Sequence, residues 1–126
     1  MHSVFIVEDN KDLGRMYERA FHLNNFEVEL AFDGAAALER LKTMQRKPSV
    51  ILLDIMVPTM SGIDVLRAIK QDDTLKHIPV VILTNSLKKD NTDLFLTLGA
   101  SAYIIKLEND AKDVVDRVAK LLIKAE

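Results

Sequence analysis

Residues 50–62 read VILLDIMVPTMSG, and this stretch decides the fold. It begins with an uninterrupted apolar run from Val50 to Leu53, which stops at Asp54. A continuous apolar run bounded in this way is typical of a central parallel strand that is buried on both faces. Pro58 cannot donate a hydrogen bond to a neighbouring strand, so the segment after Asp54 is predicted to be a loop.

A helix is predicted directly after this loop. Ser61 and Gly62 precede a run of helix-forming residues, and Asp64 follows Ser61 by three positions, which is a partial capping-box pattern. We expect this helix to span Gly62–Lys70. Residues 50–70 therefore predict one strand–loop–helix unit of an α/β protein.

The same alternation continues in both directions along the chain. Short apolar runs predict four further strands, and apolar residues at helical spacing predict four further helices. The strand at 26–32 alternates apolar and polar residues, so it is expected near a sheet edge with one wetter face. The (βα)₅ order predicts a parallel sheet covered by helices on both faces. The further strands are Ser3–Val7, 26–32, Ile78–Leu83 and Ala102–Ile105, and the further helices are Lys11–Leu23, Ala35–Met44, Leu87–Leu98 and 111–122.

The residues that end the predicted strands carry the candidate chemistry. In parallel sheets of this type, ligands bind outside the carboxyl ends of the strands. Three carboxylates at one rim repel one another unless a cation is present, and hard oxygen ligands of this kind suit Mg²⁺. With the metal offsetting their charge, Asp54 is a candidate nucleophile that would form an acyl phosphate, while Lys106 and Thr84 would hold the phosphoryl oxygens. The residues at these ends are Glu8, Asp9, Asp54, Thr84 and Lys106.

Each of these residues also has a purely structural interpretation. An acid at the end of a parallel strand is more often the N-cap of the next helix, and this applies to Asp9. Thr84 and Lys106 are ordinary residue types at strand ends. Asp54 is followed by a loop rather than by a helix, so capping explains it less well. The combination of all of them favours a phosphoryl site over the separate structural roles.

Composition narrows the class of protein further. The chain has 126 residues, with 17 Lys and Arg against 19 Asp and Glu and a formal net charge of −2, so one domain without a broad basic face is expected. Direct nucleic-acid binding is therefore not expected. The absence of cysteine excludes disulfides, thiol chemistry and cysteine-ligated metals. No apolar run is long enough for a membrane span and no signal peptide is recognisable, so we expect no membrane association and a cytoplasmic location.

The order and spacing of the strand-end residues resemble the receiver domain of two-component response regulators, and the resemblance covers essentially the whole chain. Residues 52–62 match the segment that carries the phosphoacceptor of that family, with Asp54 in the acceptor position. The resemblance implies a doubly wound, flavodoxin-like, three-layer α/β sandwich with a parallel sheet in the order 2-1-3-4-5. It also implies that residues 1–126 form a single receiver domain, with no output domain in this chain.

The resemblance assigns a role to each candidate residue. Asp9 and Asp54 would bind Mg²⁺ through their carboxylates, and Mn²⁺ would substitute. Glu8 would act on the metal through water, and Met56 would supply its backbone carbonyl. Thr84 would move toward the new phosphoryl oxygens and vacate space for Tyr103, which would bias a two-state surface.

The resemblance also implies the partners. The phosphoryl donor would be a sensor histidine kinase or a histidine phosphotransfer protein. The surface formed by the fourth helix, the fifth strand and the fifth helix would bind a downstream effector or output domain, and phosphorylation would favour a homodimer. The protein would catalyse its own phosphorylation and a slow autodephosphorylation, and it would not be a metabolic enzyme.

Two residues depart from the family pattern. Leu107 follows Lys106 where the family usually has a proline in a cis peptide, and a cis bond before a residue other than proline costs about 2.5–4 kcal/mol. We therefore predict a trans bond and a different loop after Lys106. Asn85 follows Thr84 where the family prefers alanine or glycine. Two interpretations of Asn85 remain open: it slows the access of the donor or of water, or it hydrogen-bonds to the phosphoryl group.

Three other classes of function fit the sequence less well. An aspartate-nucleophile phosphatase usually places a second aspartate two residues after the nucleophile, and Met56 occupies that position. A flavodoxin-like cofactor binder is disfavoured because neither Gly-x-Gly-x-x-Gly nor a P-loop is present. A silent receiver that acts only as a scaffold would require Asn85 and Leu107 to disable the pocket.

Overall fold

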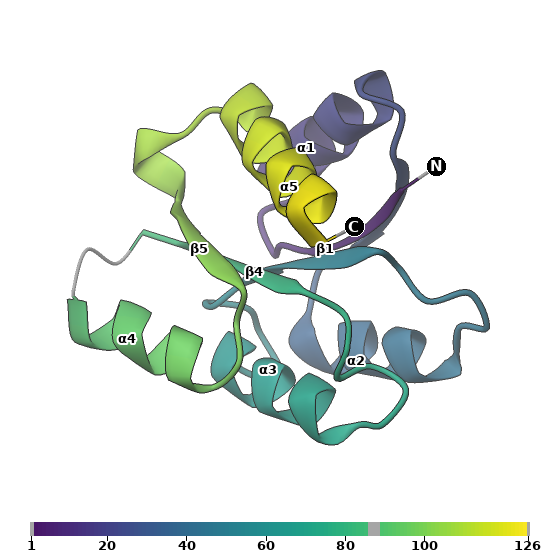
Figure 1. Ribbon diagram of the computed structural model, residues 1–126, viewed down its shortest axis with the longest axis vertical. Coiled ribbons are helices and arrows are strands. Elements are labelled where there is room, and N and C mark those ends of the chain that lie inside the picture. Colours follow the sequence, from purple (N-terminus) through teal and green to yellow (C-terminus); the bar gives the residue numbers. More distant parts are fainter. Residues whose placement is uncertain (1, 86–88, 126) are drawn as a thin grey trace.

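The computed structural model describes residues 2–85 and 89–125. In this part of the chain, five strands alternate with five α-helices, and a short 3-10 helix precedes the last of them (Figure 1). The strands are β1 Ser3–Val7, β2 Glu27–Ala31, β3 Val50–Asp54, β4 Val80–Thr84 and β5 Ala102–Ile105. The helices are α1 Lys11–Leu23, α2 Gly34–Thr43, α3 Gly62–Gln71, α4 Lys89–Thr97, η1 Lys106–Glu108 and α5 Ala111–Ala125.

The strands form one parallel sheet in the order β2-β1-β3-β4-β5. This confirms the predicted α/β fold and its strand order. The apolar run that decided the fold becomes β3, the middle strand, in which all residues are buried. Figure 1 shows α1 and α5 on one face of the sheet and α2, α3 and α4 on the other.

Each face of the sheet has its own hydrophobic core, because successive side chains of a strand point to opposite faces. Ile51 and Leu53 of β3 pack with residues of α2, α3 and α4. Val50 and Leu52 pack with residues of α1 and α5. The continuous apolar character of β3 therefore reflects burial on both sides.

The predicted element boundaries hold to within about two residues at most positions. The predicted helix 111–122 instead continues to Ala125, and the predicted strand Ile78–Leu83 begins two residues later, at Val80. The Ile78 N–H donates to the Leu75 carbonyl in a turn, and Pro79 has no N–H, so neither residue joins the strand through a donor. The predicted helix Leu87–Leu98 is present as Lys89–Thr97, and Leu87 lies outside the described residues.

Polar side chains begin three of the helices. Asn10, Asp33 and Ser61 each accept a hydrogen bond from the backbone N–H three residues later. Such caps satisfy donors that have no partner inside the helix. The expected cap at Ser61 is confirmed, and the cap of α1 is Asn10, so Asp9 does not serve as the helix cap.

A charged side chain from α2 binds to the outer edge of β2. Arg40 of α2 donates from Nη1 to the Leu30 carbonyl at 2.8 Å and pairs through Nη2 with Glu29. The strand alternates exposed and half-buried residues until Ala31, as its sequence pattern predicts for an edge.

Among the helices of the described residues, none has the length and apolar character needed to cross a membrane.

Candidate functional site

A pocket of about 530 Å³ opens at the carboxyl ends of β1, β3 and β5. The parallel sheet creates it, because the loops that follow these strands all leave from the same edge. Most of the residues predicted from strand ends meet here. The lining residues are Glu8, Asp9, Asn10, Leu13, Met16, Tyr17, Asp54, Met56, Asn85, Lys106, Leu107 and Asn109.

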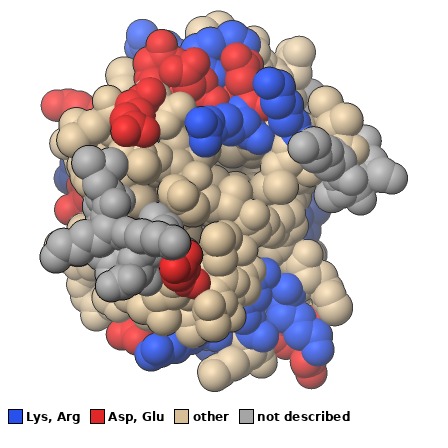
Figure 2. Space-filling model, turned by 60° about the vertical axis from the view of Figure 1, so that its left-hand side comes forward, with Lys and Arg blue, Asp and Glu red and all other residues tan. Residues whose placement is uncertain are grey.

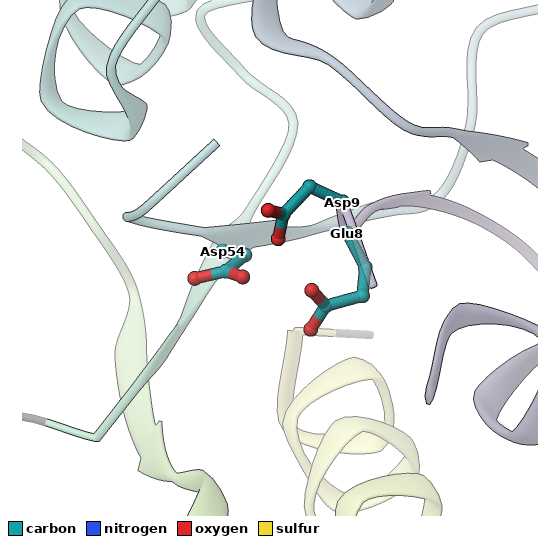
Figure 3. A group of neighbouring side chains, drawn as sticks. All are labelled: Glu8, Asp9 and Asp54. Atoms are coloured by element: carbon teal, nitrogen blue, oxygen red, sulfur yellow. The ribbon is translucent and has the colours of Figure 1, made fainter. Parts of the chain in front are cut away.

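Three carboxylates converge in this pocket. Oxygens of Glu8, Asp9 and Asp54 all lie within 4.8 Å of one another. Figure 3 shows Glu8 and Asp9 reaching in from the end of β1 and Asp54 from the end of β3. Glu8 and Asp54 are buried, whereas Asp9 is exposed. The cluster thus has a dry side and a side open to solvent.

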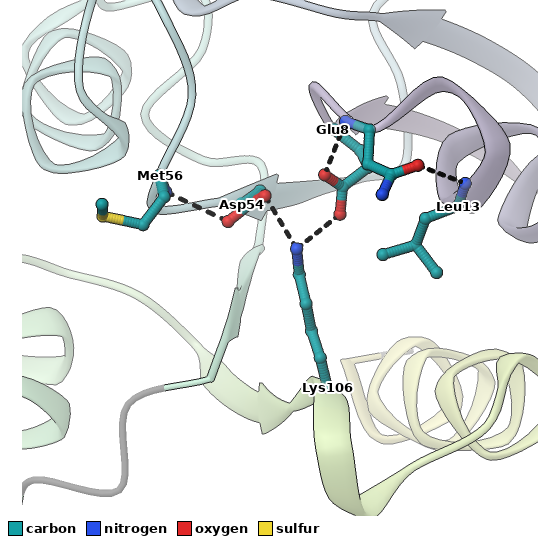
Figure 4. A network of polar contacts seen from close by, with 6 residues as sticks. Glu8, Leu13, Asp54, Met56 and Lys106 are labelled. Carbon is teal, nitrogen blue, oxygen red and sulfur yellow. Dashed lines mark hydrogen bonds and ion pairs between the residues drawn. The ribbon is translucent and has the colours of Figure 1, made fainter.

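Lys106 provides the positive charge of the cluster. Its Nζ lies 2.6 Å from Glu8 Oε1 and 2.8 Å from Asp54 Oδ2. In Figure 4 the side chain extends from the end of β5 to a point between the two carboxylates. Burial alone would lower the pKa of Lys106, but its hydrogen bonds and ion pairs with Asp54 and Glu8 outweigh burial and raise that pKa. Lys106 is therefore a fixed ammonium beside Asp54.

Backbone groups orient the two buried carboxylates. The Met56 N–H donates to Asp54 Oδ1 at 3.0 Å, so both oxygens of Asp54 have a donor (Figure 4). The Asn10 N–H donates to Glu8 Oε2 at 3.2 Å. These contacts come from the loops that follow β3 and β1, which makes the orientation of each carboxylate dependent on its loop.

Glu8 has an unusual protonation equilibrium. Burial and the neighbouring Asp54 raise the pKa of Glu8, Lys106 opposes the rise, and the pKa that results is about 7. The Glu8 Oε1 atom is buried and makes no hydrogen bond within the described residues, although Lys106 lies beside it as an ion pair. The cation that balances the charge of this oxygen is the Lys106 ammonium.

The donor set suits a divalent metal ion. Three carboxylates offer hard oxygen ligands, and one of them has a buried oxygen without a hydrogen bond. Mg²⁺ prefers oxygen ligands and is commonly held by one or two carboxylates together with water. The open side at Asp9 leaves room for such water. The residues therefore fit a divalent cation.

Glu8 makes the stability of the metal-free protein depend on pH. Its pKa is about 7 in the folded protein and near 4.5 in the unfolded chain, so the folded state keeps a proton that the unfolded state has released. Stability should fall as pH rises from about 4.5 to about 7, by up to about 3 kcal/mol. Denaturant unfolding in EDTA across this range measures the loss. Glu8→Gln keeps the shape and should lack this component, and equal pH slopes for both proteins would contradict the assignment.

Two predicted residues lie apart from the pocket lining. Thr84 ends β4, is buried and has Ile105 of β5 as its register partner. Tyr103 of β5 is half-buried and lines hollows beside α5 together with Ala102 and Arg117. By strand alternation Thr84 has the orientation of Ile82, which packs in the core toward α2, α3 and α4, and Tyr103 packs against the same core.

The two departures from the family pattern both line the pocket. Asn85 and Leu107 are exposed, and 82% of the Leu107 surface is accessible. No cis peptide occurs in the described parts of the chain, which confirms the trans bond before Leu107. Residues after this bond form the short helix η1. Lys106 nevertheless reaches Asp54, so the changed loop leaves the lysine in place.

Sequence reasoning missed Tyr17 and Asn109 as pocket residues. Tyr17 is 2% exposed on the buried face of α1, and it also lines the pocket. Burial raises its pKa to about 12, so its hydroxyl stays protonated. Asn109 Nδ2 donates to the Ile105 carbonyl. The helical spacing of Asn10, Leu13 and Tyr17 was the signal that could have indicated one pocket-facing stripe.

Comparison with protein families gives a match over most of the chain. Residues 4–119 match the model for the response regulator receiver domain. The response regulator ArlR of Staphylococcus saprophyticus is 33% identical over 124 residues, which cover 97% of this chain and 53% of ArlR. The polar-differentiation response regulator DivK of Brucella anthropi is 34% identical over 104 residues, which cover 82% of this chain and 83% of DivK. The chain thus spans about half the length of ArlR but most of the length of DivK.

Solved structures agree in fold. The phosphorylated cyanobacterial phytochrome response regulator RcpA is 32% identical with a TM-score of 0.88, over 100% of this chain and 97% of RcpA. The Mn²⁺-bound form of response regulator Rcp1 is 29% identical with a TM-score of 0.78, over 97% of this chain and 89% of Rcp1. One of these relatives was therefore observed with a phosphoryl group and another with a divalent metal.

Proposed function

The chain belongs to the response regulator receiver domain family, and on this premise we propose that Asp54 accepts a phosphoryl group from a phosphohistidine. The observation that carries the proposal is the placement of Asp54 beside the Lys106 ammonium and within the carboxylate cluster that it forms with Glu8 and Asp9. The family comprises signalling modules of two-component systems rather than metabolic enzymes. The donor in this proposal is a sensor histidine kinase or a histidine phosphotransfer protein.

The proposed step is a nucleophilic displacement at phosphorus. A carboxylate oxygen of Asp54 attacks the phosphorus atom, the bond from phosphorus to the imidazole nitrogen breaks, and its electron pair stays on that nitrogen. The product is an acyl phosphate on Asp54. Lys106 lies close enough to Asp54 to neutralise charge that develops on the phosphoryl oxygens.

The proposed ligands of Mg²⁺ are the carboxylates of Asp9 and Asp54 and the Met56 backbone carbonyl, with Glu8 acting through water and with Mn²⁺ as a substitute for Mg²⁺. When bound, the cation offsets the charge of the carboxylates and of the incoming phosphoryl group. The Met56 N–H keeps Asp54 oriented by donating to Oδ1. Glu8 and Lys106 exclude water from the buried side of the cluster, because both lie at the base of the pocket.

We propose that Thr84 and Tyr103 transmit the chemical change to a partner. Thr84 ends β4, the strand next to β3, and Asp54 ends β3. Its hydroxyl would turn toward the phosphoryl oxygens, and Tyr103 would then move inward from its half-buried position on β5. The surface of α4, β5 and α5 would thereby change its affinity for a downstream effector or output domain, or for a second copy of the chain.

Figure 2 shows the part of the surface where this readout is proposed. An uncharged area occupies the middle of the view, and charged side chains surround it. Tyr103 and Ala102 of β5 line the hollows here, and Arg117 and Lys120 of α5 lie at their margin. A centre with few charged residues and a charged rim are common at protein interaction surfaces.

Intact mass spectrometry tests the phosphoacceptor proposal. The wild-type protein, incubated with acetyl phosphate, is expected to gain one phosphoryl group with Mg²⁺ and essentially none in EDTA. Asp54→Asn should gain none under either condition, because the amide is not a nucleophile of the required kind. Failure of the wild-type protein with acetyl phosphate and with a phosphorylated histidine kinase, together with failure to bind Mg²⁺, would instead indicate a silent interaction domain.

A further inference from the structure

We propose that Thr59 and Asp33 form a positioning pair that fixes the loop after Asp54 in the conformation that binds metal and accepts the phosphoryl group. This inference rests on the proposed function of Asp54 and Met56. Thr59 lies outside the pocket, and its role would be exerted through the loop of residues 55–61 rather than by contact with a ligand.

Thr59 has a strained backbone. Its φ is 68°, in the left-handed region, and a β-branched residue is a genuine outlier there. Glycine or asparagine would adopt this conformation at lower cost. Strain of this type persists only where surrounding contacts hold it, and it is concentrated at functional sites.

The contacts that hold Thr59 come from the start of α2. Thr59 Oγ1 donates to Asp33 Oδ1 at 2.9 Å and accepts the Ala35 N–H at 3.1 Å. The Gly34 N–H donates to the Pro58 carbonyl at 3.0 Å. The backbone approach is so close that a Cβ on Gly34 would lie 2.2 Å from the Met60 carbonyl oxygen. The distal half of the loop is thus fastened to α2.

The proximal half of the same loop is fastened to the site. The Met56 N–H donates to Asp54 Oδ1, and the Ile55 carbonyl accepts from the Gly62 N–H at 2.9 Å. A short loop held at both ends has little freedom, so the place of Met56 depends on Thr59. The Thr59 hydroxyl therefore influences the Met56 N–H, which donates to Asp54, and the Met56 carbonyl, which is a proposed metal ligand.

Capping of α2 alone does not explain the hydroxyl of Thr59. Asp33 Oδ1 already accepts the Ala36 N–H at 2.7 Å, which is a complete N-cap. The hydrogen bonds that Asp33 accepts from the Ala36 N–H and from the Thr59 hydroxyl hold its pKa below the usual range. An unstrained glycine at position 59 would leave this cap intact. The hydroxyl adds a connection between the cap and the loop, and that connection is the feature we assign to positioning.

Three substitutions at position 59 separate the hydroxyl from the strain. Thr59→Ser keeps the hydroxyl, Thr59→Val keeps the shape without the hydroxyl, and Thr59→Gly removes the hydroxyl and accepts the positive φ. Mn²⁺ affinity, measured by electron paramagnetic resonance on the unphosphorylated full chain, is expected to fall roughly tenfold in the valine and glycine variants, as for residues that orient metal ligands. The serine variant should bind as the wild type does.

A second readout follows the loop without metal. The amide resonance of Met56 should shift or broaden in the valine and glycine variants and stay in place in the serine variant. If the valine variant does not fold, the glycine variant still carries the test, because glycine adopts the positive φ without strain. Thr74→Val is the matched control, because the Thr74 hydroxyl also donates to an aspartate, Asp72, but lies outside the loop that follows Asp54.

The outcomes distinguish the inference from the proposed function. Wild-type affinity for Mn²⁺ and an unchanged Met56 amide in all three variants, in a protein whose Asp54 is phosphorylated, would overturn the positioning pair and leave the proposed function standing. A wild-type protein that neither binds Mn²⁺ nor accepts a phosphoryl group would overturn the proposed function and this inference with it.

Discussion

Replacing Lys106 with methionine is expected to slow phosphoryl transfer to Asp54 about 100-fold or more while tightening the binding of Mg²⁺. The ammonium of Lys106 lies 2.8 Å from Asp54 Oδ2 and 2.6 Å from Glu8 Oε1. Loss of one positioned donor from a site that stabilises developing negative charge commonly costs this much in rate. The same ammonium competes with a metal for the carboxylates, so its loss should increase the affinity for Mg²⁺ by at least about tenfold.

Intact mass against time and Mg²⁺ titration of the same preparation measure both effects. Methionine is apolar and similar in length to the stem of lysine, so the substitution removes the ammonium group with its charge and its hydrogen bonds. Lys112→Met is the matched control, because Lys112 is exposed and pairs with Asp116 on the surface of α5. Loss of transfer together with weaker Mg²⁺ binding would show that Lys106 supports the fold of the site rather than its chemistry.

Gly62→Ala is expected to destabilise the protein by about 3 kcal/mol, within the range for forced overpacking. A Cβ at Gly62 would lie 2.5 Å from Ile55 Cα and 2.7 Å from the Asp54 carbonyl oxygen. Both atoms belong to the backbone that carries the phosphoacceptor, so relief of the clash must displace β3 or its loop. Metal affinity should fall at the same time, because the Met56 N–H would no longer be aligned with Asp54.

Urea unfolding with and without Mg²⁺ measures the change at Gly62. Gly14→Ala is the control, since the closest contact of a Cβ at Gly14, in the first turn of α1, would be the flexible end of the Leu30 side chain, at 3.2 Å. Alanine is favoured over glycine by about 1 kcal/mol in a helix interior, so the control should be neutral or stabilising. Equal free energies of unfolding for the two variants would refute the close approach at Gly62.

The sequence was sufficient to predict the fold because each element carries a clear local signal. The uninterrupted run at Val50–Leu53 could only be buried on both faces, and the alternating run at 26–32 belonged at an edge. The helix N-cap predicted at Ser61 was also confirmed. The start of β4 was less well predicted, since Pro79 obscures where hydrogen bonding begins.

The candidate site was predictable in part. Strand ends of a parallel sheet meet at one edge, so the convergence of Glu8, Asp54 and Lys106 followed from topology. The distances and the raised pKa of Glu8 did not follow, because they depend on burial and side-chain orientation. The positive φ of Thr59 was equally hidden, since a β-branched residue is among the least expected in that conformation. The roles given to Thr84 and Tyr103 remain predictions.

The guanidinium of Arg40 has a consequence for association between chains. Edge strands offer unpaired backbone groups to which another molecule can add a strand, and this is a common route to aggregation. At β2 the Leu30 carbonyl is already occupied by Arg40, and the charge of Glu29 stands beside it. An incoming strand would have to displace a charged hydrogen bond before it could form its own. The charged hydrogen bond at Leu30 therefore disfavours extension of the sheet at β2.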